Sequence, residues 1–125
     1  MASDPLNIHP TLLSTLSGSL ANFYAYLKQY NVSSNVVVMT ISDFGRTPND
    51  NTANGTDHGQ ASVALVLGDM VTGGVYGDYP SLTQLDSGQL SVTVPYQNVV
   101  SDIVTAIGGN AQQILGVSYP KLGFI

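Results

Sequence analysis

The sequence feature that most constrains the fold is an almost uninterrupted apolar run, Val-Val-Val-Met-Thr-Ile, at residues 36–41. The run is rich in β-branched residues and apolar at both odd and even positions. This pattern is typical of a strand buried on both faces, as in a parallel sheet that helices cover from both sides. A second short apolar run at residues 63–67 predicts another strand of the same kind.

Helical patterns flank these two runs. Before them, apolar residues recur at intervals of three and four, the spacing of an amphipathic helix: Leu12, Leu16, Leu20, Phe23, Leu27 and Tyr30. After them, Pro95 opens a second helix that Gly108 ends, and a short helix is expected near residues 111–115. We expect residues 1–10 to be a polar lead-in and residues 89–94 to form an edge strand. This order predicts an α/β fold in a single domain over residues 1–125.

Composition excludes several classes of function. The chain has 125 residues, three Lys or Arg, eight acidic residues and a formal net charge of −5. Three scattered cations cannot form the basic face that nucleic-acid binding needs, and an anionic membrane surface is disfavoured for the same reason. No apolar run is long enough to cross a bilayer, and no signal peptide is expected at the start of the chain. The absence of cysteine excludes thiolate catalysis and cysteine-type zinc sites.

The scarce charges are concentrated in one polar segment, residues 43–59. It directly follows the first apolar run and contains Asp43, Asp57, His58 and the only arginine, Arg46. In open α/β sheets, ligands bind beyond the carboxyl ends of the strands. The sequence therefore predicts that a site, where the chain has one, lies in this segment.

Three chemistries are compatible with such a segment. Asp43, Asp57 and His58 offer the oxygen and imidazole ligands of Zn, Mn or Mg, while Arg46 suits a phosphate or sulfate oxyanion. Alternatively, the aspartates cap turns, His58 is a hydrogen-bonded loop residue and Arg46 pairs with an aspartate. A Ser-His-Asp triad is disfavoured because no Gly-x-Ser-x-Gly motif occurs. The glycines of residues 73–77 match no phosphate-binding motif and are better explained as turn residues.

The segment also carries a recognisable combination of motifs. Ser-Asp-Phe-Gly-Arg-Thr at residues 42–47, Asn51 and Gly-Thr-Asp-His-Gly at residues 55–59 resemble an uncharacterised bacterial family of the alkaline-phosphatase/sulfatase superfamily. The resemblance covers nearly the whole chain, from His9-Pro-Thr-Leu-Leu to the closing Pro-Lys-Leu-Gly-Phe at residues 120–124. Members are several times longer and often carry twin-arginine export signals. The resemblance thus implies a periplasmic or extracellular parent protein of which this chain is the C-terminal portion.

The resemblance also implies a fold and roles for single residues. The fold would be part of an alkaline-phosphatase-like three-layer domain, with a mostly parallel sheet flanked by helices. Asp43 and His58 would hold one divalent metal (Zn, Mn or Mg), and Asp57 would orient His58. Arg46 would bind the phosphoryl or sulfuryl group of a small anionic ester. Phe44 stands where the superfamily has a ligand histidine, so a complete two-metal centre is not expected.

Two consequences complete these expectations. The superfamily's nucleophile comes from an N-terminal half that this chain lacks, so the chain alone is expected to be inactive and to need that half as a partner. The alternative is a non-catalytic binding or structural module that keeps the fold but has lost the two-metal site. A third possibility is a truncated reading frame with no independent role. Such a chain would have an exposed sheet edge, and this edge would favour association with other chains.

Overall fold

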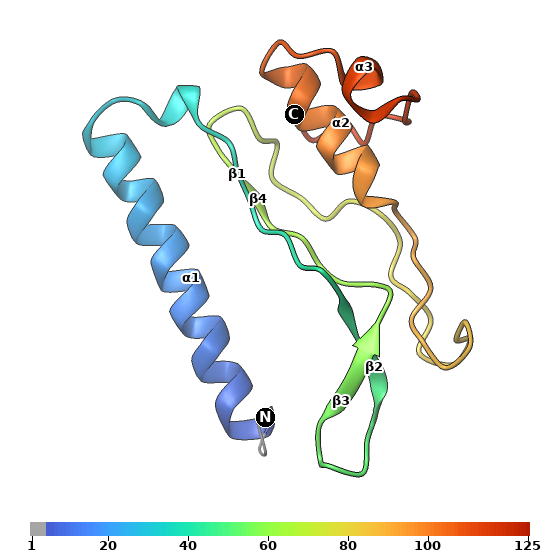
Figure 1. Cartoon of the computed structure of the whole chain (residues 1–125). Helices are drawn as coiled ribbons and strands as arrows, with labels where there is room; N and C mark the ends of the chain where they lie inside the picture. Colours follow the sequence, from blue (N-terminus) through green and yellow to red (C-terminus); the bar gives the residue numbers. More distant parts are fainter. Residues whose placement is uncertain (1–4) are drawn as a thin grey trace.

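The computed structural model describes residues 5–125 of the chain (Figure 1). A long helix stands beside an extended body made of two small sheets, two further helices and long irregular connections. In chain order the elements are α1 (Pro5–Gln29), η1 (Ser33–Asn35), β1 (Val38–Met39), β2 (Gly45–Asp50), β3 (Thr56–Gly59), β4 (Val66–Leu67), α2 (Tyr96–Ala106) and α3 (Ala111–Leu115).

The expected three-layer fold with a mostly parallel sheet is wrong. The described residues form two separate two-stranded sheets, β1 with β4 and β2 with β3, and both are antiparallel. Each apolar run contributes only two residues to a strand, with Val38 opposite Leu67 and Met39 opposite Val66. No helix among the described elements packs on either sheet, and Ile41 and Val63 are 83% and 82% exposed.

The antiparallel arrangement has a simple cause. A parallel pair of strands needs a long crossover connection, usually a helix, whereas a hairpin returns the chain antiparallel. The polar segment between the two apolar runs folds into the β2–β3 hairpin and brings the second run back beside the first. The pairing extends by one residue, because the Thr40 amide donates to the Leu65 carbonyl (2.9 Å) and the Leu65 amide donates to Thr40 Oγ1 (2.9 Å).

Helix α1 is longer than its apolar spacing predicts. The expected lead-in over residues 1–10 is wrong from Pro5 onwards, because the helix already begins there and Pro10 lies inside it; residues 1–4 lie outside the described part. Pro5 occupies the first turn, where the missing amide of proline costs no helical hydrogen bond. The helix ends at Gln29, and Asn31, two residues further on, adopts the left-handed conformation (φ 56°) often found just after a helix.

The C-terminal half of α1 is anchored by one carboxylate. Asp69, in the connection after β4, accepts hydrogen bonds from the hydroxyls of Tyr24 and Ser33 (2.7 Å for Ser33) and pairs with the Lys28 ammonium at 2.7 Å. The Lys28 hydrogen bond comes first among the interactions that lower the pKa of Asp69 to about 2, followed by those of Tyr24 and Ser33. Beyond this anchor, η1 is the one described element that packs against α1.

The expected helices near the C-terminus are confirmed. Helix α2 follows Pro95, and the chain leaves it through Gly108, whose φ of 84° is left-handed. The side chain of Asn110 caps α3 by accepting from the Gln113 amide (3.0 Å). The expected edge strand at residues 89–94 is wrong, since only an isolated bridge between Asp86 and Gln89 forms there.

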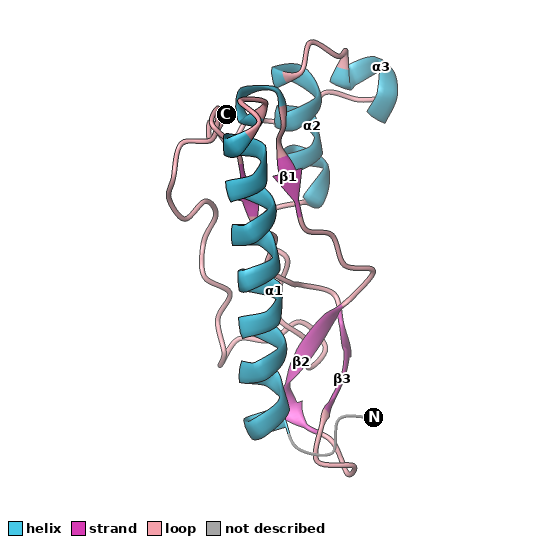
Figure 2. Ribbon diagram, turned by 90° about the vertical axis from the view of Figure 1, so that its left-hand side faces the viewer, coloured by secondary structure: helices cyan, strands magenta, loops and turns pink. Residues whose placement is uncertain are grey.

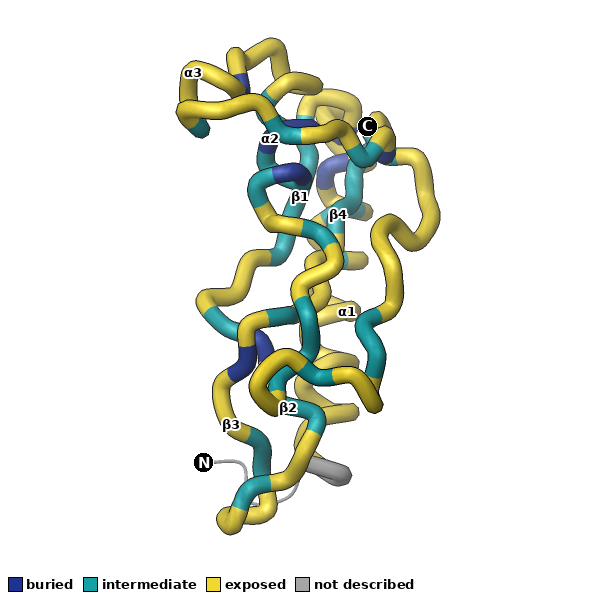
Figure 3. The backbone as a smooth tube through the Cα atoms, turned by 90° about the vertical axis from the view of Figure 1, so that its right-hand side faces the viewer, coloured by how far each residue is buried: buried dark blue, intermediate teal, exposed yellow. Residues whose placement is uncertain are grey.

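The buried interior is small and lies mainly where α2 meets the C-terminal tail (Figure 3). Among the described residues the buried hydrophobic side chains are Leu27, Ala111 and Phe124. Asp102 of α2 is only 3% exposed and accepts hydrogen bonds from the amides of Leu122 (2.8 Å) and Gly123 (3.0 Å), so it ties the C-terminal tail to the helix. No described helix combines the length and apolarity needed to span a membrane.

Candidate functional site

The β2–β3 hairpin brings the two motifs of the polar segment together. Its register places Gly45 opposite Gly59 and Arg46 opposite His58, with an irregularity between Arg46 and Asp50. Residues directly opposite each other in an antiparallel pair project to the same face. The structure therefore joins Arg46 and His58, which are twelve positions apart in the sequence, as immediate neighbours.

Glycine is required at the base of this hairpin. A Cβ atom on Gly45 would lie 1.6 Å from the carbonyl oxygen of Ala61, and one on Gly59 would lie 2.8 Å from the carbonyl carbon of Arg46. Both obstructing atoms belong to the backbone, so no side-chain rotation can relieve the overlap. The two motif glycines thus allow the close backbone approach that sets Arg46 against His58.

Phe44 completes a small aromatic cluster on the Arg46 face. It precedes Arg46 by two residues, so in an extended chain it lies on the same face and diagonal to His58. Its ring stacks on the His58 imidazole with centroids 3.6 Å apart and planes 12° apart. The Arg46 guanidinium carbon lies 5.0 Å from the centre of the Phe44 ring, within the range of a cation–π contact. Phe44 therefore positions both polar side chains.

Arg46 is exposed and carries an unbalanced charge within the described part of the chain. Its Nη1 donates to the Thr56 carbonyl oxygen at 2.9 Å, which holds the side chain along β3. The ion pair among the described residues is the one between Lys28 and Asp69, and neither Asp43 nor Asp57 pairs with Arg46. The alternative in which Arg46 pairs with one of these aspartates is therefore wrong.

The Asp57 side chain stabilises the hairpin turn through a hydrogen bond with Asn51. Adjacent residues of a strand point to opposite faces, so Asp57 and His58 diverge. Asp57 Oδ1 accepts from Asn51 Nδ2 at 2.8 Å, and Asn51 Oδ1 accepts from the amides of Ala53 (3.0 Å) and Gly55 (3.1 Å). Asn51 is thus the organiser of the turn, a role that its position in the motif alone does not reveal.

The described residues do not assemble a metal centre by themselves. No group of three or more His, Cys, Asp or Glu side chains in this part of the chain could hold a metal ion. Asp43 lies just before β2, one residue from Phe44, and no hydrogen bond or ion pair involves it in the described structure. Asp43 and His58 offer two donors at most, fewer than the three or four protein ligands of a zinc site.

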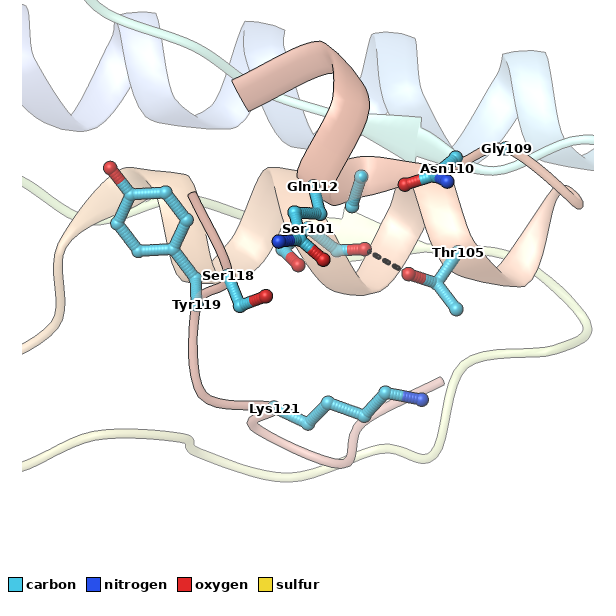
Figure 4. Close-up of a pocket in the computed structure, with 9 residues that line it drawn as sticks. Ser101, Thr105, Gly109, Asn110, Gln112, Ser118, Tyr119 and Lys121 are labelled. Atoms are coloured by element: carbon cyan, nitrogen blue, oxygen red, sulfur yellow. Dashed lines mark hydrogen bonds between the residues drawn. The ribbon is translucent and has the colours of Figure 1, made fainter. Parts of the chain in front are cut away.

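A separate hollow of about 370 Å³ lies between α2, α3 and the C-terminal tail (Figure 4). Sequence reasoning did not find it, because hydroxyl and amide side chains scattered over residues 101–121 carry no motif. The Thr105 hydroxyl is turned back to the Ser101 carbonyl (2.7 Å), as Figure 4 shows. The side chains that line the hollow include one cation, Lys121, and no histidine or carboxylate. The lining residues are Ser101, Thr105, Gly109, Asn110, Ala111, Gln112, Ser118, Tyr119 and Lys121.

An exposed hairpin that presents Arg46 and His58 side by side, on a chain whose described residues bury little, is the candidate site of this protein. The family model described as "Protein of unknown function (DUF1501)" matches residues 6–117, and the chain belongs to this family. No curated protein and no solved structure matches the chain significantly. The expected membership of an uncharacterised family is thus confirmed, while the place of that family in the alkaline-phosphatase/sulfatase superfamily stays a prediction.

Proposed function

We propose that the β2–β3 hairpin binds the anionic group of a small phosphoric or sulfuric ester, and that the chain contributes this site to a hydrolase. The observation that supports the proposal most directly is the pairing of Arg46 with His58 on one exposed face, without a carboxylate on the guanidinium. An exposed cation that no described residue neutralises is a ready partner for an oxyanion.

Each residue has a definite part in this proposal. The guanidinium of Arg46 has a planar set of donors that matches two oxygens of a phosphoryl or sulfuryl group. Its Nη1 is held by the Thr56 carbonyl, so the donors on the other side of the group face the ligand. His58 lies next to the bound anion and can donate a hydrogen bond to it, or exchange a proton with the ester's leaving oxygen.

The proposed site is completed from outside these 125 residues. A hydrolase of this kind needs a nucleophile and further charge stabilisation, and the resemblance places both in an N-terminal half of a longer, exported parent. A divalent metal held by Asp43 and His58 belongs to the same proposal. It requires additional ligands from that half, because the described residues do not fit a metal centre alone.

The binding part of the proposal can be tested on the chain itself. We would titrate inorganic sulfate, inorganic phosphate and p-nitrophenyl phosphate while following the side-chain resonances of Arg46 and His58 by NMR. The expected result is saturable shifts of both side chains, with at least a tenfold loss of affinity in Arg46→Ala and a smaller loss in Arg46→Lys.

The matched control is Lys121→Ala, which removes an exposed cation far from the hairpin in the sequence and leaves anion binding at the hairpin unchanged. Equal melting temperatures for the three variants would show that the fold is intact. The proposal is wrong if the Arg46→Ala chain binds the anions as tightly as the wild type, or if the wild-type resonances do not move.

A second candidate is a non-catalytic binding or structural module, and a different observation favours it. Large hydrophobic side chains remain exposed along the whole described chain, from Ile8 (38%) to Val117 (53%). A module that works by docking needs such a surface, whereas an anion site does not. This candidate predicts that Arg46→Ala leaves the biological activity of the protein intact.

A further inference from the structure

The turn of the β2–β3 hairpin contains the one Asn-Gly pair of the sequence, Asn54-Gly55. Figure 2 shows this turn at the free end of the hairpin, opposite the end of the molecule where α2 and α3 lie. Asn54 is exposed and left-handed (φ 55°), and its side chain makes no hydrogen bond in the described structure. No described contact therefore ties down the Asn54 carboxamide.

Nothing in the geometry of the hairpin requires glycine at position 55. Its φ is not left-handed, and the atom nearest to the place where a Cβ would lie is Asn51 Oδ1, at the ordinary contact distance of 3.8 Å. Gly45 and Gly59, in contrast, are both required by close backbone contacts. Glycine at position 55 matters chemically, because its amide nitrogen has no side chain beside it to hinder an attack on the Asn54 carboxamide.

An asparagine that precedes such an amide can lose ammonia without an enzyme. The deprotonated Gly55 amide nitrogen attacks the side-chain carbonyl carbon, Cγ, of Asn54, and the side-chain nitrogen leaves as ammonia. Water then opens the resulting five-membered succinimide at either of its two carbonyls. One opening gives aspartate, and the other gives isoaspartate, in which the main chain runs through the side-chain carbon.

Asn51 holds the attacking nitrogen in the folded hairpin. The Gly55 amide donates to Asn51 Oδ1 (3.1 Å), and the Gly55 carbonyl oxygen accepts from the Asn51 amide (2.7 Å). Asn51 is itself fixed by the hydrogen bond from its Nδ2 to Asp57 Oδ1 (2.8 Å). The Gly55 nitrogen must leave Asn51 Oδ1 before it can attack Asn54, so the reaction needs a local opening of the turn.

We propose that Asn54 is a deamidation site of this protein, and that the hydrogen bond from Gly55 to Asn51 sets the rate of the reaction. The modification would occur whether or not the hairpin binds an anion, because it needs only the turn and water.

One consequence of the modification rests on the proposed anion site. Thr56, whose carbonyl holds the Arg46 guanidinium, lies two residues from Asn54. Isoaspartate at position 54 lengthens the main chain beside this anchor and adds a negative charge, which repels an anion. The modified hairpin should therefore bind sulfate several-fold more weakly than the unmodified one.

Asn31 is a control within the same chain. It is exposed and left-handed (φ 56°) like Asn54, but Val32 follows it. The branched Val32 side chain crowds the amide nitrogen, which also donates to the Leu27 carbonyl (3.0 Å). Incubation of the wild-type chain at mildly alkaline pH, followed by peptide mass spectrometry, should show isoaspartate and aspartate at position 54 and unchanged asparagine at position 31. Isoaspartate identifies the succinimide route, because direct hydrolysis gives aspartate alone.

Asn51→Ala tests the role of the hydrogen bond. It releases the Gly55 amide and should raise the rate at position 54 by about tenfold, towards that of a synthetic peptide of residues 51–57. Thr52→Ala is the matched control, since it alters an exposed residue of the same turn whose side chain makes no described hydrogen bond, and it should react at the wild-type rate. Gly55→Ala fits the hairpin and should slow the reaction several-fold.

The possible failures are distinguishable from one another. Absence of isoaspartate at position 54 in both wild type and Asn51→Ala, once the peptide has been converted, would overturn the site. A wild-type chain that reacts as fast as Asn51→Ala would overturn the role of the hydrogen bond. The modified form carries one more negative charge and can be separated by ion exchange, so its sulfate affinity can be compared with that of the unmodified form. Equal affinities of the two forms would overturn the link to the anion site, whereas the mass measurement does not depend on anion binding at all.

Discussion

Arg46 and His58 lie directly opposite each other in the β2–β3 hairpin, one residue from the facing pair Gly45 and Gly59. The two polar residues depend on the two glycines, because any side chain at the glycine positions collides with backbone atoms. The chemistry proposed for the hairpin thus rests on a steric condition at its base, and that condition can be tested separately from ligand binding.

Alanine substitution of two glycines should have opposite effects on stability. Gly45→Ala forces Cβ against the Ala61 carbonyl oxygen, and we expect it to lower the free energy of unfolding by about 2 kcal/mol or more. Gly18→Ala meets no atom within 4 Å in the middle of α1, and we expect it to stabilise the chain by up to about 1 kcal/mol. Urea denaturation followed by circular dichroism measures both changes.

The NMR resonances of the hairpin give a second measurement of the effect of Gly45→Ala. The resonances of Arg46 and His58 should move in Gly45→Ala and stay in place in Gly18→Ala. Unchanged stability and unchanged hairpin resonances in Gly45→Ala would mean that Ala61 is not packed against β2.

Local patterns predicted the helices well. Apolar spacing indicated α1, Pro95 and Gly108 marked the bounds of α2, and the short α3 was expected at residues 111–115. These signals are local, because a helix closes its hydrogen bonds within its own segment. The start of α1 was missed because Pro10 resembles a first-turn proline, although Pro5 occupies that turn.

The sheets could not be predicted in the same way. An apolar run such as residues 36–41 indicates a buried strand, but it does not identify the strand beside it. The pairing was decided by the hairpin between the two runs, whose turn depends on Asn51 and on the left-handed Asn54 (φ 55°). The polar segment of residues 43–59, in which the sequence predicts the site, forms this hairpin. The contact of Phe44 with His58 was missed because it depends on strand register, as does the divergence of Asp57 from His58.

Acid should loosen the attachment of α1. The hydrogen bonds from Lys28, Tyr24 and Ser33 hold the pKa of Asp69 at about 2, below its ordinary value of 3.8. A lowered folded-state pKa means that the carboxylate stabilises the fold above pH 3.8, and that this contribution is lost as the pH falls through about 2. We therefore expect the stability difference between wild type and Asp69→Asn to shrink steadily from pH 5 to pH 2, as measured by urea denaturation. A difference that stays constant over this range would contradict the assignment.

The same attachment should weaken in alkali. The hydrogen bond to Asp69 raises the pKa of Lys28 above 10.5 and that of Tyr24 above 10.0. Groups with a raised folded-state pKa stabilise the fold below their ordinary pKa and lose that contribution as the pH rises through the folded value. Wild type should thus approach the stability of Lys28→Met above about pH 11. Tyr79→Phe, at an 87% exposed tyrosine away from Asp69 in the sequence, is the control.

Asp102 should be the most sensitive aspartate for stability. It is buried and accepts two backbone amides of the C-terminal tail, which leads on to the buried ring of Phe124. Asp102→Ala leaves both amides without an acceptor, and we expect a loss of about 3 kcal/mol. Asp78→Ala, at an exposed aspartate whose side chain makes no described hydrogen bond, should change stability by less than about 0.5 kcal/mol. Similar urea midpoints for the two variants would show that the tail is not held by Asp102.

Phe44→His tests whether the hairpin is one substitution away from a metal site. The Phe44 and His58 rings are stacked with centroids 3.6 Å apart, so an imidazole at position 44 would lie against that of His58. Side-chain rotation would then have to aim one nitrogen of each ring, and the carboxylate of the preceding residue Asp43, at a shared metal. Three such ligands are the protein set of an open zinc site. We expect Phe44→His to bind Zn²⁺ at least tenfold more tightly than wild type at neutral pH, as measured by competition with a chromogenic zinc indicator. Adding Asp43→Asn or His58→Ala to this variant should remove the gain, whereas adding His9→Ala should not. A gain that survives His58→Ala would place the metal elsewhere, and no gain at all would mean that the ring at position 44 does not face His58.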